Sequence, residues 1–330
     1  MTAITHATSV DPASDPNAGK FRDPDRTLKG EVRARVPLTS LDTLWINTGS
    51  LCNITCANCY IESSPSNDRL AYVTPAEIEP LLDEARALGT REIGFTGGEP
   101  FLNPDIIALL QAALARGFDV LVLTNAMTPM LRPRVARGLV ELRETFARQF
   151  TLRVSLDHHT AELHEKERGA ATFARTLEGI DWLAANGFTF TIAGRTCWGE
   201  SEADARTGYG ALFAARRWPL SAASRTELIL FPEMDGKLTV PEITVACWNI
   251  LKISPSDMMC AHSRMVVKRK GGDAPVVLPC TLLPYDSAFE MGVTLAEAAV
   301  ADGGMFENGA VKLCHPHCAK FCVLGGGSCS

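Results

Sequence analysis

The sequence lacks two features that would reveal location and partners at once. No apolar run approaches the roughly 20 residues that a membrane-spanning helix needs, and residues 1–30 contain no apolar block of a secretory signal. There is also no excess of basic residues. The formal net charge is -6 and the isoelectric point is near 5.7, so the chain as a whole is not attracted to nucleic acid or to an anionic membrane. We therefore expect a cytoplasmic protein that binds neither.

Cysteine, by contrast, is abundant. The 330 residues contain 11 cysteines, and in a reducing cytoplasm their grouping indicates metal ligation rather than disulfides. Three lie within residues 52–59, four lie within residues 314–329, and the other four are scattered between these groups. This distribution predicts two separate metal-binding regions.

The residue pattern divides the chain into three parts. Residues 1–40 are rich in Asp, Pro, Thr and Arg without a sustained apolar period, which predicts a flexible N-terminal arm. Over residues 41–240, short β-like runs alternate with amphipathic helical stretches, a pattern typical of a parallel sheet with helices outside. The expected strands are Thr43–Thr48, Glu92–Thr96, Asp119–Thr124, Thr151–Leu156, Phe188–Ala193 and Thr226–Phe231.

Helix signals between these strands support the alternation. Thr74 and Glu77 are placed to form a capping box around Pro75, and Gly89 follows at the far end of the same helix. Six βα units fall short of the eight that close a complete barrel. The fold class is therefore expected to be α/β, a partial (βα)6 TIM-type barrel with its chemistry at the carboxyl ends of the strands.

After about residue 240 the alternation fades. Residues 241–330 are expected to form a small cysteine-rich C-terminal module, in which Met265–Lys268 and Pro275–Leu278 make a hairpin.

The first cysteine group has a distinctive spacing. Cys52, Cys56 and Cys59 form a C-x3-C-x2-C pattern directly after the first expected strand. A three-cysteine loop leaves one iron of a four-iron cluster open to a ligand that is not protein. A zinc knuckle or unligated core cysteines are the alternatives, but zinc would ordinarily need a fourth protein ligand nearby, and no local histidine or cysteine supplies one. The spacing favours an iron–sulfur cluster.

The second expected strand ends in Thr96-Gly97-Gly98-Glu99-Pro100, where glycine lets the backbone approach a ligand closely. With the cysteine loop, this GGEP sequence makes residues 41–231 resemble the radical S-adenosylmethionine (SAM) superfamily. The resemblance implies that a [4Fe–4S] cluster on the three cysteines binds SAM at its open iron. Electron transfer from the cluster would then release a 5′-deoxyadenosyl radical, which abstracts hydrogen from the substrate.

Other polar positions are expected to gather around SAM. On the same resemblance and on their places at the strand ends, the SAM-binding residues are expected to be Gly97, Gly98, Glu99, Asn125, Ser155, Asp157, Arg195 and Tyr60. Each also has a structural interpretation, as a turn former, a helix cap or a partner in a surface ion pair. One departure is Asn58, which stands where the family often has an aromatic residue.

The second cysteine group partly resembles the SPASM/Twitch extensions of radical SAM enzymes. That resemblance implies one or two auxiliary [4Fe–4S] clusters, although the x3, x3 and x6 spacings at the C-terminus differ from the full SPASM pattern. The alternative is a zinc site that uses His315 or His317 with neighbouring cysteines. The candidate ligands are Cys260, Cys280, Cys314, Cys318, Cys322 and Cys329.

The sequence thus predicts a radical SAM enzyme that receives electrons from a flavodoxin or ferredoxin. Its substrate would be either a small metabolite or a ribosomally made peptide. The short N-terminal arm leaves no room for a fused leader-binding domain, which slightly favours a small molecule, or else a peptide that a separate partner presents. An iron–sulfur electron carrier or a zinc-stapled binding protein is the alternative from a different functional class, and neither would bind SAM.

Overall fold

The computed structural model describes residues 17–231 and 239–325. Their centre is an eight-stranded sheet in the order β7-β6-β5-β4-β3-β2-β8-β9, in which only the β8–β9 pair is antiparallel. Its first six strands along the chain are β2 (Thr43–Asn47), β3 (Glu92–Thr96), β4 (Asp119–Thr124), β5 (Phe150–Ser155), β6 (Thr189–Arg195) and β7 (Leu228–Phe231). The expected partial barrel is confirmed.

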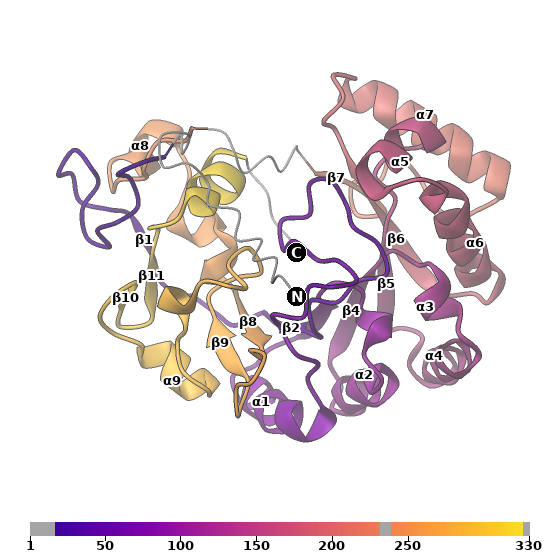
Figure 1. Ribbon diagram of the computed structural model, residues 1–330, viewed down its shortest axis with the longest axis horizontal. Helices are drawn as coiled ribbons and strands as arrows, with labels where there is room; N and C mark the ends of the chain where they lie inside the picture. Colours follow the sequence, from indigo (N-terminus) through magenta and orange to yellow (C-terminus); the bar gives the residue numbers. More distant parts are fainter. Residues whose placement is uncertain (1–16, 232–238, 326–330) are drawn as a thin grey trace, which may run out of the picture.

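Helices cover the outer face of these strands, as Figure 1 shows. Because parallel strands joined by helices all run the same way, their carboxyl ends meet at one edge of the barrel. Thr74 and Glu77 form the expected capping box at the start of the first of these helices. The helices are α1 (Pro75–Ala87), α2 (Ile106–Ala115), α3 (Thr128–Leu131), α4 (Pro133–Phe146), α5 (Ala161–Arg168), α6 (Thr172–Ala185) and α7 (Glu202–Arg216).

A large aromatic side chain is buried against the sheet between β2 and β3. Trp45 on β2 is only 1% exposed and lies opposite Gly94 of β3 in the parallel register. A Cβ atom on Gly94 would lie 2.3 Å from the Trp45 ring. Glycine at this position therefore makes the space that the indole occupies.

The C-terminal segment continues the barrel's sheet. Strand β8 (Ser263–Val267) pairs in parallel with β2 and in antiparallel with β9 (Val276–Leu278), so the expected hairpin is present but shares its sheet with the barrel. All five residues of β8 are buried, as expected for a strand covered on both faces. The remaining elements are α8 (Cys247–Leu251), α9 (Leu295–Val300), β10 (Phe306–Glu307), β11 (Ala310–Lys312) and short helical turns.

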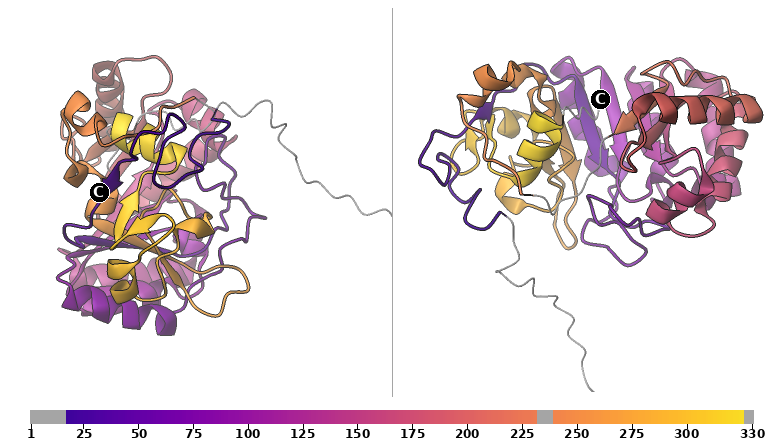
Figure 2. Two further views of the ribbon diagram at one scale, coloured as in Figure 1. Left: turned by 90° about the vertical axis from the view of Figure 1, so that its left-hand side faces the viewer. Right: turned by 90° about the horizontal axis from the view of Figure 1, so that it is seen from above.

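The prediction of a loose N-terminal arm over residues 1–40 is wrong for residues 17–40. Strand β1 (Arg35–Val36) pairs with β11, and the buried Arg33 donates to Glu242 Oε1 at 2.6 Å and to the Leu313 carbonyl at 3.2 Å. This indigo segment therefore lies against the yellow C-terminal elements in Figures 1 and 2. Composition could not predict this, because the contacts that order the segment come from residues more than 200 positions away. No helix in the described ranges combines the length and apolarity needed to cross a membrane.

Candidate active site

The three cysteines of the first group share one cavity. The loop that follows β2 brings Cys52, Cys56 and Cys59 to a cavity at the carboxyl edge of the sheet, with about 670 Å³ of space that is partly open to solvent. Six of the eight residues expected to bind SAM line the same cavity, namely Tyr60, Gly97, Gly98, Asn125, Ser155 and Arg195. The fold thus assembles most of the predicted site from the ends of five strands, β2 to β6.

The two glycines after β3 allow the start of the cysteine loop to pack closely against the end of this strand. Gly97 has a φ of +143°, and a Cβ there would lie 2.5 Å from the Gly49 carbonyl oxygen. A Cβ on Gly98 would lie 2.1 Å from the carbonyl oxygen of Leu51. The amide of Gly98 donates to Gly49 and that of Glu99 donates to Leu51, at 2.8 and 3.0 Å. Only glycine allows β3 to approach the loop this closely.

Glu99 is held inside the protein rather than at the cavity surface. Its carboxylate accepts hydrogen bonds from Thr124 Oγ1 at 2.9 Å, from the Asn125 amide at 2.9 Å and from the Phe101 amide at 3.2 Å. Burial raises the pKa of Glu99 to about 7 even though these donors lower it. The geometry gives the side chain a role in joining the ends of β3 and β4.

Asn125, at the end of β4, reaches the cysteine loop. Its Nδ2 donates to Asn53 Oδ1 at 2.9 Å and lies 3.9 Å from Cys52 Sγ. Burial raises the pKa of the Cys52 thiol to about 12, and the nearby Glu99 adds to the increase. A buried thiol of this kind ionises readily only beside a positive charge, which a metal centre provides.

A buried ion network lies beyond the end of β5. Arg168 Nε and Nη2 donate to the two Asp157 carboxylate oxygens at 2.7 and 3.1 Å, while Arg195 lies 3.4 Å from Asp157 and 3.3 Å from Glu167. Burial alone would raise the pKa of Asp157, but the two arginines hold it below its usual value. Asp157 therefore positions the arginines and does not itself line the cavity.

Arg168 was not predicted as a site residue. Arg168 lines the cavity together with Arg195, so two guanidinium groups face the space beside the cysteines. Arg168 is the last residue of α5, whereas the site residues were predicted from the ends of the strands. The alternative of a surface ion pair for Arg195 is wrong, because its side chain is only 13% exposed.

The residues present fit a cluster with an open iron. Among the described residues that line the cavity there are three cysteines, no fourth cysteine and no histidine, so a four-coordinate zinc site is incomplete there. The buried hydroxyl of Ser63 lines the same cavity and has no hydrogen-bond partner within the described ranges. The arginines offer planar forks suited to a carboxylate. Three thiolates, a polar wall and two cations match a cluster that binds SAM.

A second cavity lies in the C-terminal segment. Four of the six candidate ligands line it, namely Cys260, Cys280, Cys318 and Cys322. Burial raises the pKa of Cys260 to about 11 and that of Cys318 well above the ordinary value. Four thiols on one cavity are the number that one complete cluster requires.

Two other predicted ligands are not brought to this cavity. Cys314 lies against the N-terminal segment, where its Sγ donates to the Asp23 carbonyl oxygen at 3.4 Å. Cys329 lies outside the described residues. His317 does line the cavity and its Nδ1 lies 3.1 Å from the Leu282 carbonyl oxygen, so Nδ1 carries the proton and Nε2 keeps a lone pair. Three thiols and this imidazole remain the zinc alternative.

A histidine pair stands close to the network at the end of β5. His158, His159 and Glu200 place potential ligand atoms within 4.8 Å of one another. However, His158 Nδ1 accepts the Thr160 amide at 3.0 Å, so its proton sits on Nε2 and is donated to Glu200 at 2.8 Å. His158 therefore has no free nitrogen for a metal, and it is hydrogen-bonded to Glu200 instead.

The chain resembles proteins of known family. Residues 46–203 match the radical SAM superfamily. The antilisterial bacteriocin subtilosin biosynthesis protein AlbA of Bacillus subtilis is 30% identical over 143 residues, which is 43% of this chain and 30% of AlbA. Mycofactocin maturase MftC of Mycobacterium ulcerans is 30% identical over 137 residues, 42% of this chain and 35% of MftC. The matches thus span less than half of either relative.

Solved structures share the fold. Streptococcus suis SuiB bound to S-adenosylmethionine superposes with a TM-score of 0.59 at 14% identity, covering 81% of this chain and 67% of SuiB. The structure of anSMEcpe with bound AdoMet gives a TM-score of 0.54 at 15% identity, covering 79% of this chain and 80% of that one. Residues 46–203 therefore form a segment that matches the radical SAM superfamily, and this segment brings the cysteine loop and the GGEP turn to one cavity.

Proposed function

We propose that this chain is an enzyme that cleaves SAM reductively and uses the product to abstract hydrogen from a substrate. The observation that carries the proposal is the single cavity that joins Cys52, Cys56 and Cys59 to the glycines of the GGEP turn. When bound there, a reduced [4Fe–4S] cluster would supply the electron that splits SAM into methionine and the 5′-deoxyadenosyl radical. An electron carrier would need neither the glycine turn nor an open iron.

The protein's own residues would bind and orient the cofactors. The three thiolates would hold the cluster, and the backbone at Gly97 and Gly98 would lie along SAM. Arg168 and Arg195 would pair with its carboxylate, since both guanidinium groups line the cavity and are held in place by Asp157.

The C-terminal cavity is proposed to hold one auxiliary [4Fe–4S] cluster. Cys260, Cys280, Cys318 and Cys322 would be its ligands, and this number of thiols supports a complete cluster without Cys314. We propose a functional division into a barrel over residues 41–240 and a cluster-bearing segment over residues 241–330, although β8 of the second part extends the barrel's sheet. The location is proposed to be the cytoplasm, where a flavodoxin or ferredoxin would supply electrons.

A peptide is the substrate class best supported. AlbA and MftC are by name a bacteriocin biosynthesis protein and a maturase, and SuiB has been solved with its precursor peptide SuiA. A small metabolite is the second candidate, because a GTP 3′,8-cyclase of Pseudomonas fluorescens is 32% identical over 155 residues.

The test is an anaerobic assay. The protein is reconstituted with iron and sulfide, reduced with dithionite and given SAM, and 5′-deoxyadenosine is measured by liquid chromatography. We expect the nucleoside from the wild-type chain and none from Cys56→Ala. A properly loaded wild-type protein that forms no nucleoside would refute the proposed function and favour an electron carrier.

A further inference from the structure

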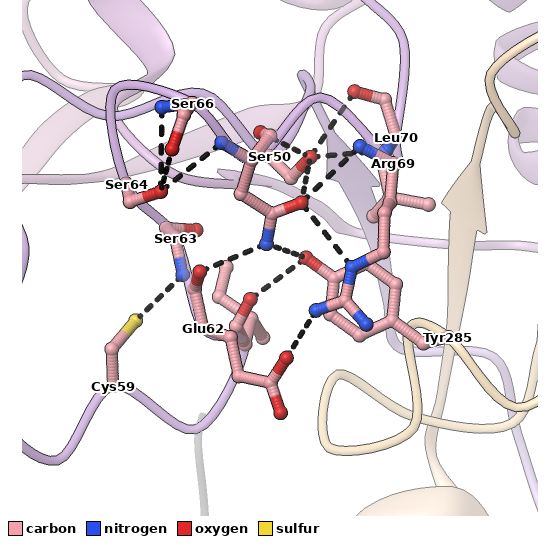
Figure 3. A network of polar contacts seen from close by, with 11 residues as sticks. Ser50, Cys59, Glu62, Ser63, Ser64, Ser66, Arg69, Leu70 and Tyr285 are labelled. Atoms are coloured by element: carbon pink, nitrogen blue, oxygen red, sulfur yellow. Dashed lines mark hydrogen bonds and ion pairs between the residues drawn. The ribbon is translucent and has the colours of Figure 1, made fainter. Parts of the chain in front are cut away.

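A tyrosine of the C-terminal segment contacts the loop that carries the third cysteine. Tyr285 follows the second-cavity residue Cys280 by five positions, and its hydroxyl donates to the Ile61 carbonyl oxygen at 2.7 Å. Ile61 is two residues past Cys59. Figure 3 shows the tyrosine ring reaching into this loop from a different part of the chain. One short segment therefore joins the two cysteine sites.

The contacted loop makes a strained turn around the Cys59 sulfur. Glu62 has a φ of +50°, the left-handed region that a residue with a Cβ rarely adopts. Asn67 Nδ2 donates to the Glu62 carbonyl oxygen at 2.8 Å and to the Tyr285 hydroxyl at 3.1 Å. The next amide, that of Ser63, donates to Cys59 Sγ at 3.3 Å (Figure 3). The polar contacts thus hold the turn in the conformation that aims an N–H group at the sulfur.

The tyrosine ring and the backbone just before it are both held by arginines. The Arg69 guanidinium lies 3.6 Å from the centre of the Tyr285 ring, and Arg269 Nη1 donates to the Pro284 carbonyl oxygen at 2.7 Å. The ion pair between Arg69 and Glu62 is half exposed or more, so it contributes little to this arrangement. The conformation of the loop therefore depends on the contacts of the Tyr285 hydroxyl and the Asn67 side-chain amide rather than on the exposed ion pair.

We propose that Tyr285 is a positioning residue, which holds the turn after Cys59 so that the Ser63 N–H group hydrogen-bonds to the cysteine sulfur. The inference rests on the proposed function, because it assumes that Cys59 ligates the first cluster. Hydrogen bonds to ligand sulfur stabilise the reduced, more negative cluster and raise its reduction potential. By this route the C-terminal segment sets the potential of the cluster in the barrel.

The test uses the full-length reconstituted protein and a redox titration followed by electron paramagnetic resonance. The first cluster is identified as the signal that changes when SAM is added. Tyr285→Phe removes only the hydroxyl, and we expect it to keep its iron but to lower the midpoint potential of that signal. Asn67→Leu has a similar size and no charge, removes the two Nδ2 hydrogen bonds, and should shift the potential in the same direction.

A matched control lies on the same pair of segments. Lys270 makes an exposed ion pair with Asp68 of the same loop but does not contact the turn, so Lys270→Met should leave the potential unchanged. Wild-type potentials in both Tyr285→Phe and Asn67→Leu would overturn the inference while leaving the proposed function intact. A wild-type protein without any SAM-sensitive signal would instead refute the proposed function.

Discussion

Asn58 and Glu167 are joined by two parallel hydrogen bonds. The Asn58 amide and its side-chain Nδ2 donate to the two Glu167 carboxylate oxygens at 2.9 and 3.0 Å, and the Ala57 amide donates to the Glu167 carbonyl at 2.7 Å. The unusual asparagine before Cys59 therefore ties the cysteine loop to α5. Because Glu167 also pairs with Arg195, one carboxylate links the cluster loop to the cation beside it.

The first prediction concerns this carboxylate. Glu167→Gln places an amide NH2 opposite one of its two donors and removes the charge beside Arg195. Hydrogen bonds to buried charged groups contribute about 1.5–3 kcal/mol, so we expect a loss of that order in the free energy of unfolding, measured by urea denaturation, and weaker iron retention. The exposed Glu178→Gln on α6 serves as the control and should change stability by less than about 0.5 kcal/mol. Equal stabilities of the two variants would contradict the role assigned to Glu167.

The second prediction compares two glycines. In Gly98→Ala the new Cβ would lie 2.1 Å from the Leu51 carbonyl oxygen, a backbone atom that cannot move without displacing the cysteine loop. We expect the free energy of unfolding to fall by about 3 kcal/mol or more, measured by thermal denaturation. We also expect no cluster binding, measured as iron content. Gly210→Ala on α7 meets only the Ala222 Cβ at 3.6 Å, so it should leave stability unchanged or raise it by up to about 1 kcal/mol. Normal iron content in Gly98→Ala would show that the close approach is not required.

The third prediction concerns acid stability. His164 is fully buried, and burial together with the charge of Arg168 lowers its pKa to about 4, whereas Asp157 acts in the opposite direction. The unfolded chain takes up a proton near pH 6.5 but the folded chain does not until about pH 4. Neutral His164 therefore makes its full contribution to the free energy of unfolding above pH 6.5. This contribution is lost as the pH falls toward 4, and about 2 kcal/mol of it is lost at pH 5.

Replacing His164 isolates this contribution. His164→Leu cannot take up a proton, so the pH dependence of its unfolding free energy between pH 7 and pH 5 should be shallower than that of the wild type by about 2 kcal/mol. Urea denaturation of the metal-free chain at both values makes the comparison. Parallel curves for the two proteins would mean that His164 is not kept neutral by the fold.

The fourth prediction concerns the auxiliary metal. Serine at Cys260, Cys280, Cys318 or Cys322 should remove the iron of one cluster while leaving the first site loaded, because these four thiols line one cavity. Cys314→Ser should keep the wild-type iron content, since that thiol contacts Asp23 instead. Iron and zinc are both measured on the anaerobically purified protein. Stoichiometric zinc in place of the lost iron would favour the alternative site with His317.

The sequence predicted the barrel because its signals are local. Each strand is a short apolar run, and a capping box such as that of Thr74 and Glu77 lies within one helical turn. Such patterns fix the type and order of the elements. The hairpin was also predicted, but its parallel pairing with β2 was not, because no local pattern specifies which strand lies beside β8.

The sequence by itself determined which residues could carry the chemistry: the spacing of Cys52, Cys56 and Cys59, the glycines after β3, and the cysteine-rich C-terminal segment. Only the tertiary structure decided their roles. Arg168 lines the cavity and is held there by Asp157, while Cys314 contacts Asp23 and lies apart from the other thiols. Tyr285 reached Ile61 across 224 positions. The spacing of the ligand residues can be read from the sequence, whereas burial and long-range contacts depend on how distant segments pack.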